Sequence, residues 1–119
     1  MSEINLNQIF IAHPVAFVVS TITEFAKESG VSVFVLDDLN DFRYLIEDLN
    51  PQALIIHEDL WNGSTESFNR ETTGFECLRT ILIQKNDDNN GHLSIVEPFE
   101  PSKFIEQVKQ LLESDSKKH

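Results

Sequence analysis

The chain has 119 residues, with 20 acidic against 9 basic side chains and a formal net charge of −11. This acidity argues against direct binding of nucleic acid or of an anionic membrane surface, because both need basic protein surface. The sequence contains no apolar run of about 18 residues, so no membrane insertion is expected.

The length fits one domain, 1–119, in which we expect 1–7 and 114–119 to be flexible ends. The first ten residues lack the basic and apolar segments of a signal peptide. Cys77 is the only cysteine, which excludes an internal disulfide. These features predict a protein of the cytoplasm, where thiols stay reduced.

The first two elements are a strand and a helix. The apolar run Ile9–Ala12 indicates the strand. Pro14 suits the first turn of a helix, so we predict a helix over 14–29 that ends at Gly30. The apolar face expected for this helix consists of Phe17, Val18, Ile22, Phe25 and Ala26.

A second strand and a second helix follow. The strand is predicted at Val31–Leu36, and the helix at Asp41–Leu49 with Asn40 or Asp41 as its cap. Apolar residues at i, i+3, i+4 and i+7 give this helix a clean stripe, which consists of Phe42, Leu45, Ile46 and Leu49.

The third strand is predicted at Ala53–Ile56, after a break at Asn50–Pro51. An apolar run without polar alternation suits a strand buried on both faces, although so short a run also fits a helix segment. The polar stretch Asp59–Thr73 is expected to be a long loop. Gly74–Arg79 is expected to be a short helix.

The last third of the chain contains two more strands and a helix. We predict strands at Ile81–Gln84 and Leu93–Val96, with Lys85–His92 as the loop between them. A helix is predicted over 102–113, with an apolar face made of Phe104, Ile105, Val108, Leu111 and Leu112. Strands that alternate with helices predict an α/β fold, in which a parallel sheet carries helices on both faces.

Three short segments carry a family resemblance. Asn50–Pro51 with its following strand, the glycine-led Gly74–Arg79 and the segment Glu97–Pro101 stand in the order of matching segments in receiver domains of two-component response regulators. There they approach the phospho-acceptor strand, start the third helix and form a Lys-Pro-Phe ending. The resemblance covers nearly the whole chain. It implies a flavodoxin-like three-layer sandwich with five parallel strands in the order 2-1-3-4-5.

The resemblance also implies where the family's phosphoryl chemistry falls. The cation-binding acidic pair falls on His13 and Pro14, the phospho-acceptor on His57 or Glu58, the hydroxyl on Gln84 or Lys85, and the lysine on Glu97. Pro14 has no side-chain oxygen for Mg²⁺, and Glu97 is negative where positive charge is needed. We therefore expect a non-enzymatic pseudo-receiver without a cofactor, which serves bacterial signalling as a phosphorylation-independent protein–protein interaction module.

The chain departs from the family's architecture in two places. The expected loop after the third strand is longer than usual, and Lys85–His92 is too short to hold the family's fourth helix, which we expect to be missing or much reduced. A protein partner would then contact a different face. Trp61 and Phe68 are candidate partner contacts, or they pin the expected loop onto the domain.

His13 and His57 end strands that are neighbours in the implied sheet. With Glu58, Asp59 or Asp38 they are candidate ligands of Zn²⁺ or another transition metal, which would make the chain a metal or small-ligand sensor. The alternatives are two polar strand-end residues or a proton switch. We expect no bound metal.

Three further residues near these strand ends have predicted roles. Glu58 either points into the site and imitates a phosphorylated acceptor, or is an ordinary solvated carboxylate. Lys85 is a candidate ion-pair partner of Glu97 or Glu58. Pro98 is a candidate for a cis peptide bond.

Overall fold

The computed structural model describes residues 6–75, 78–85 and 93–116 of the chain. They form a five-stranded parallel sheet in the order β2-β1-β3-β4-β5, which confirms the order implied by the family resemblance. The strands are β1 (Gln8–Ala12), β2 (Ser32–Val35), β3 (Ala53–His57), β4 (Arg79–Gln84) and β5 (Leu93–Val96).

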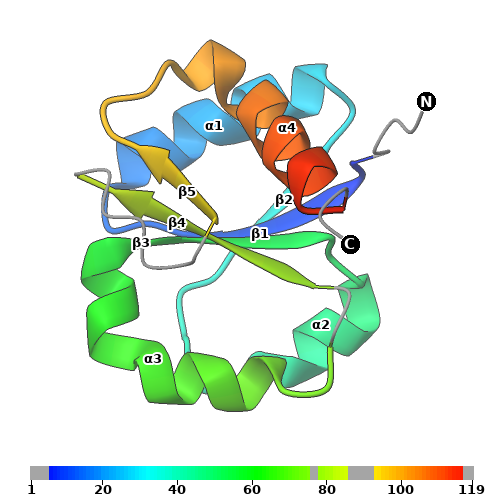
Figure 1. The fold of residues 1–119 in the computed structure, drawn as a ribbon, viewed down its shortest axis with the longest axis vertical. Helices are drawn as coiled ribbons and strands as arrows, with labels where there is room; N and C mark the ends of the chain where they lie inside the picture. The colour runs from blue at the N-terminus through cyan, green and yellow to red at the C-terminus, as the bar shows by residue number, and fades with distance from the viewer. Residues whose placement is uncertain (1–5, 76–77, 86–92, 117–119) are drawn as a thin grey trace.

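Helices cover both faces of the sheet, which confirms the three-layer sandwich (Figure 1). One face carries α1 (Ala16–Glu28) and α4 (Phe104–Ser116), with a 3-10 turn at Pro101–Lys103 before α4. The other face carries α2 (Arg43–Leu49) and α3 (Glu58–Thr72). Within the described parts of the chain, no helix is both long and apolar enough to cross a membrane.

Strand β3 lies in the middle of the sheet, and all of its residues are buried. Successive side chains of a strand point to opposite faces. Ala53 and Ile55 accordingly pack into the core beneath α1 and α4, whereas Leu54 and Ile56 pack into the core beneath α2 and α3. The apolar run is therefore a strand buried on both faces, as predicted.

The first helix begins later than predicted, and its buried face agrees with the predicted one only in part. Its N-cap is Val15, and its buried residues are Val19, Ile22 and Ala26. Phe17 is 78% exposed, so the prediction that it packs into the core is wrong. Gly30 has φ 78°, a left-handed conformation that glycine adopts without strain, and it follows the helix as predicted.

The second helix has a tertiary cap. Neither Asn40 nor Asp41 caps it; Phe42 occupies the N-cap position without a side-chain cap of its own. The carboxylate of Glu71 on α3 instead accepts hydrogen bonds from the backbone N–H groups of Phe42 and Arg43, at 2.9 and 2.8 Å. The apolar stripe of this helix faces the α2/α3 core, which confirms the predicted packing.

The prediction of a long polar loop after β3 is wrong, because these residues form helix α3. The helix is interrupted at Ser64, whose backbone is non-helical. Phe68 is 1% exposed, and its ring lies 5.6 Å from that of Phe42 and 5.2 Å from that of Trp61. Phe68 is therefore a core residue and not a partner contact. With the partly buried Trp61, it holds this segment on the sheet, which was the alternative prediction.

The connection after α3 also differs from the prediction. Gly74 lies in a turn with φ 96°, and Arg79 already belongs to β4, so the described part of this segment forms no helix. The glycine that resembled the start of a third helix follows that helix instead. Residues 76 and 77 lie outside the described residues.

The chain ends and the β4–β5 connection are described only in part, so the predictions about them can be compared with the structure only where residues are described. Of the ends expected to be flexible, Leu6 is buried in the core, and residues 114–116 belong to helix α4, which continues to Ser116. The predicted loss of a helix between β4 and β5 concerns mainly 86–92, which lie outside the described residues. The expected cis peptide bond before Pro98 is present.

Candidate functional site

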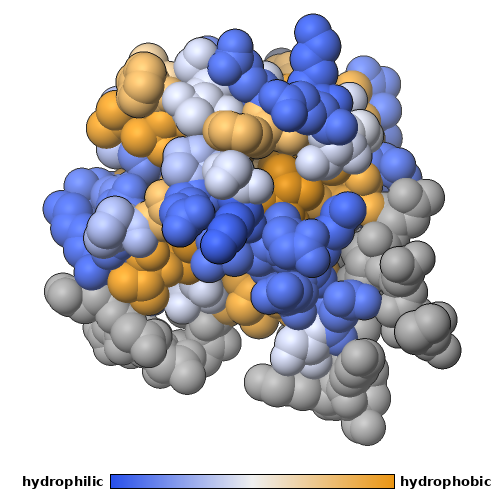
Figure 2. All heavy atoms as spheres, turned by 90° about the horizontal axis from the view of Figure 1, so that it is seen from above, coloured by the Kyte–Doolittle hydropathy of each residue, from blue (hydrophilic) through white to orange (hydrophobic). Residues whose placement is uncertain are grey.

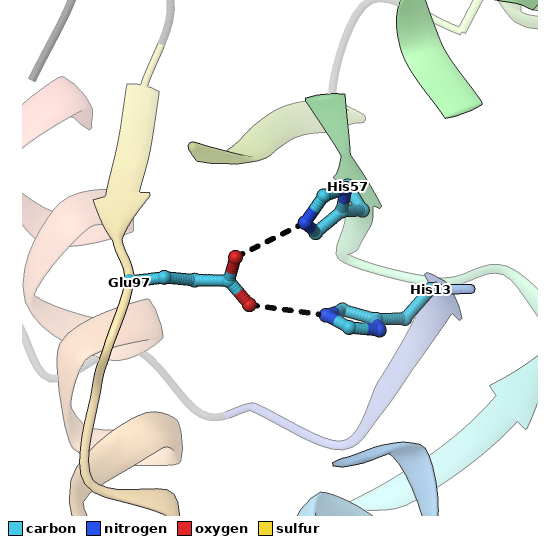
Figure 3. A group of neighbouring side chains, drawn as sticks. All are labelled: His13, His57 and Glu97. Atoms are coloured by element: carbon cyan, nitrogen blue, oxygen red, sulfur yellow. Dashed lines mark hydrogen bonds and ion pairs between the residues drawn. The ribbon is translucent and has the colours of Figure 1, made fainter. Parts of the chain in front are cut away.

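Three polar side chains meet at the carboxyl ends of the strands. His13 follows β1, His57 ends β3 and Glu97 follows β5. Nε2 of His13 lies 3.3 Å from one carboxylate oxygen of Glu97, and Nε2 of His57 lies 3.1 Å from the other (Figure 3). The two imidazole rings make an edge contact, with centroids 4.7 Å apart. We call these three residues the strand-end triad.

The backbone fixes the orientation of both rings. Nδ1 of His13 accepts a hydrogen bond from the N–H of Val15 at 3.0 Å, and Nδ1 of His57 accepts one from the N–H of Asp59 at 3.1 Å. A nitrogen that accepts a hydrogen bond carries no proton, so in a neutral ring the proton resides on Nε2. Each Nε2–H then donates to one oxygen of Glu97. The triad is thus a carboxylate held between two neutral imidazoles.

Burial and hydrogen bonding shift the titration of two triad members. The side chain of His13 is 2% exposed, and its burial lowers the pKa from the ordinary value of 6.5, against the hydrogen bond to Glu97. Burial by itself would raise the pKa of Glu97. The hydrogen bonds from His57 and His13 outweigh it and hold this pKa below the ordinary 4.5. The arrangement therefore favours neutral His13 and ionised Glu97.

Of the three carboxylates predicted to lie beside the histidines, those of Glu58, Asp59 and Asp38, most have other partners. Asp38 accepts a hydrogen bond from the backbone of Asn40, two residues on. Of the predicted set only Asp59 approaches, with a carboxylate oxygen 3.7 Å from Nδ1 of His57. Glu97 takes the central place instead. From the sequence, Glu97 is predicted only as a charge reversal at the lysine position, and its contact with the two histidines is not predicted.

The remaining predicted positions lie around the triad. Glu58 accepts a hydrogen bond from the backbone N–H of Lys85, so its carboxylate is directed toward the end of β4. The ammonium group of Lys85 lies 3.5 Å from Asp59, and the predicted pairing with Glu97 or Glu58 is wrong. Gln84 is buried, and Pro14 is exposed.

Solved structures of known proteins share this fold, whereas comparisons of the sequence found no match. No protein family model and no curated protein matches the sequence. Solved structures do match. A response regulator from Thermotoga maritima superposes with a TM-score of 0.73 at 11% identity, over 92% of this chain and 99% of that one. A response regulator receiver protein from Burkholderia phymatum gives a TM-score of 0.69 at 17% identity, over 90% and 95% of the two chains.

A longer protein matches as well. The response regulator PhyR from Brucella abortus gives a TM-score of 0.71 at 14% identity, over 96% of this chain and 50% of PhyR. Identities this low establish a likeness of fold. The chain thus has the fold of a response regulator receiver domain, and its function has to be argued from its own residues.

Proposed function

We propose that this chain is a receiver-like signalling module that binds a protein partner independently of phosphorylation. One observation carries the proposal. At the strand ends where the resembling family places its cation-binding and phosphoryl-binding groups, this chain has two histidines and a glutamate that hydrogen-bond to one another. The positions are filled by a self-contained polar cluster. The proposed role is one of binding, in the cytoplasm, and involves no catalysis.

The residues present do not fit the Mg²⁺ ion that the receiver fold implies. Mg²⁺ requires hard oxygen ligands in near-octahedral geometry. After β1 the chain offers the imidazole of His13, whose Nδ1 is bound to the backbone, and Pro14, which has no side-chain oxygen. Glu97 is held by two imidazoles. No step of a function proposed here depends on Mg²⁺.

Neither candidate acceptor is well placed for a phosphoryl group. Both ring nitrogens of His57 have hydrogen-bond partners, and Glu58 is directed to the backbone of Lys85. Glu97 adds a charge argument. Two unit charges about 4 Å apart interact by roughly 4 kcal/mol at an effective dielectric near 20. A glutamate at the lysine position therefore removes a stabilisation of that size and adds a comparable repulsion of phosphoryl oxygens.

An exposed apolar area close to the triad supports a protein-binding role. Phe17 is 78% and Val15 48% exposed at the start of α1. Phe17 lines a surface cavity of about 190 Å³ together with Pro98 and Phe99, which follow β5. On this side of the sheet, apolar and hydrophilic side chains alternate over the surface (Figure 2). Large exposed aromatic groups are typical of protein interfaces, and Phe17 takes the role predicted for Phe68.

The proposal is tested by incubating the full chain with acetyl phosphate and Mg²⁺ and measuring its intact mass, with an active receiver domain as the positive control. We expect no adduct of about 80 Da, the mass of one phosphoryl group. A stoichiometric adduct that also changes the amide NMR spectrum would contradict the proposal.

The partner surface has its own test. Capture of interacting proteins from the native cell is compared between Phe17→Ser and Tyr44→Ser. Tyr44 is the matched control, because it is 61% exposed on α2, on the opposite side of the sheet. We expect Phe17→Ser alone to lose the partner. Equal capture by both variants would exclude the Phe17 surface.

A further inference from the structure

We propose that the strand-end triad is a binding site for a divalent transition-metal ion such as Zn²⁺. Among the described residues, His13, His57 and Glu97 form a group whose ligand atoms all lie within 4.8 Å of one another. Two imidazoles and one carboxylate are a ligand set typical of Zn²⁺ sites that keep an open fourth position. Nitrogen ligands select this class of ion over Mg²⁺ and Ca²⁺, which prefer oxygen.

The spacing of the three side chains already suits a metal ion. In a tetrahedral site with bonds of 2.0–2.1 Å, neighbouring ligand atoms lie about 3.3 Å apart. Nε2 of His13 lies 3.3 Å from one carboxylate oxygen of Glu97, and Nε2 of His57 lies 3.1 Å from the other, so each imidazole is at the distance from the carboxylate that a shared ion requires. Because all three ligand atoms lie within 4.8 Å of one another, an ion bound among them would require side-chain adjustments and no separation of the strands (Figure 3).

Binding changes the tautomer of both rings. A metal on Nε2 displaces the proton there, and each neutral ring then carries its proton on Nδ1, so the exchange through solvent is proton-neutral. The new Nδ1–H faces the backbone N–H of Val15 or Asp59, and those two hydrogen bonds must break. For His57 the carboxylate of Asp59, 3.7 Å from Nδ1, is a ready new acceptor. Val15 and Asp59 therefore report occupancy of the site.

Access and charge favour a cation at this place. His13 lines a surface cavity of about 490 Å³ between α1 and β2, whose walls include Glu24 and Asp37. Both acidic residues are exposed, and the whole chain carries a net charge of −11. A negative surface raises the local concentration of cations. The fourth coordination position remains for water or for a ligand from a partner.

The experiment is calorimetric titration of the metal-free full chain with Zn²⁺, alongside amide NMR. We expect one saturable site and shifts of the Val15 and Asp59 resonances. His57→Ala and Glu97→Gln should each weaken binding by roughly tenfold or more, since loss of even an outer-shell partner costs that much. Glu97→Gln keeps the side-chain shape, and its amide NMR spectrum, recorded in the same experiment, separates loss of a ligand from misfolding. The control His92→Gln/His119→Gln, at the two other histidines of the chain, should bind unchanged.

Three results would overturn the proposal: no saturable heat, binding that survives Glu97→Gln, or binding lost in the His92→Gln/His119→Gln control. The outcome is independent of the proposed function, because the phosphorylation test uses Mg²⁺ and a phosphoryl donor and contains no Zn²⁺.

Discussion

Replacement of Glu71 tests the tertiary cap that joins α3 to α2. One oxygen of its buried carboxylate accepts two backbone hydrogen bonds at the start of α2, at 2.9 and 2.8 Å. Hydrogen bonds to a charged group contribute about 1.5–3 kcal/mol each, and loss of a helix cap costs about 0.5–2 kcal/mol. Because the Glu71 side chain is 10% exposed, water can replace only part of its role. We expect Glu71→Ala to lower the free energy of unfolding by about 2–4 kcal/mol.

Two further variants make this measurement specific. Glu71→Gln keeps an acceptor oxygen and loses only the charge, so we expect a loss of about 1 kcal/mol. Glu66→Ala, at an exposed position of the same helix, should change stability by less than about 0.5 kcal/mol. The assay is urea unfolding followed by circular dichroism, with hydrogen exchange of the α2 amides. The reasoning fails if Glu71→Ala is no more destabilised than Glu66→Ala.

Three more predictions follow from burial and titration. Phe68→Ala should destabilise by about 3–5 kcal/mol in urea unfolding, because it empties a buried site between Phe42 and Trp61; a loss below 1 kcal/mol would contradict that packing. Phe17→Ser should leave the unfolding midpoint nearly unchanged, since Phe17 is 78% exposed, and a large loss would mean that it packs in solution. The metal-free protein should lose stability as pH falls through 6.5, because the pKa of His13 is lowered in the folded state and the unfolded chain takes up its proton first. It should lose stability again below pH 4.5, because the pKa of Glu97 is also lowered in the folded state. A urea midpoint that rises on acidification would contradict both expectations.

The strands could be predicted from the sequence because burial on both faces leaves a simple signal. A central parallel strand needs apolar residues at every position, and Ala53–Ile56 and Ile81–Ile83 have them. The sheet order followed from the family resemblance. Helix α4 could be predicted for a related reason, since its apolar residues recur at helical spacing along one face and pack in the core.

Helix α3 could not be predicted, because it buries little. Its buried residues are Phe68 and Glu71, and most of its surface is polar. Much of what stabilises helix α3 leaves no signal in the hydropathy pattern. His57 caps its first turn through Nδ1, and its acidic start suits the positive end of the helix dipole. The spacing of Trp61, Thr65, Phe68 and Thr72 is helical, and that was the one available signal.

Two of the three triad residues could be predicted to lie together. The third, Glu97, could not, because it reaches the histidines only through the length of its side chain. His13 and His57 follow from strand ends on adjacent strands, β1 and β3. Glu97 follows β5, which is separated from β3 by β4, so sheet order alone does not place it beside them. Its backbone N–H is bound to the carbonyl of Gln84 at the end of β4, at 2.7 Å, and its side chain reaches across that strand end.

Glu97 therefore does more than remove the positive charge of the family's lysine. Its carboxylate is also the acceptor that the two imidazoles need. Two neutral imidazoles whose Nδ1 atoms are occupied by the backbone present two Nε2–H donors, and donors need an acceptor. A lysine at this position would bring only more donors and leave buried polar hydrogens without partners, which is unfavourable. A carboxylate satisfies both rings at once. The three strand-end residues are thus chemically interdependent, and the lysine of a phosphorylated receiver is incompatible with the two histidines that surround Glu97.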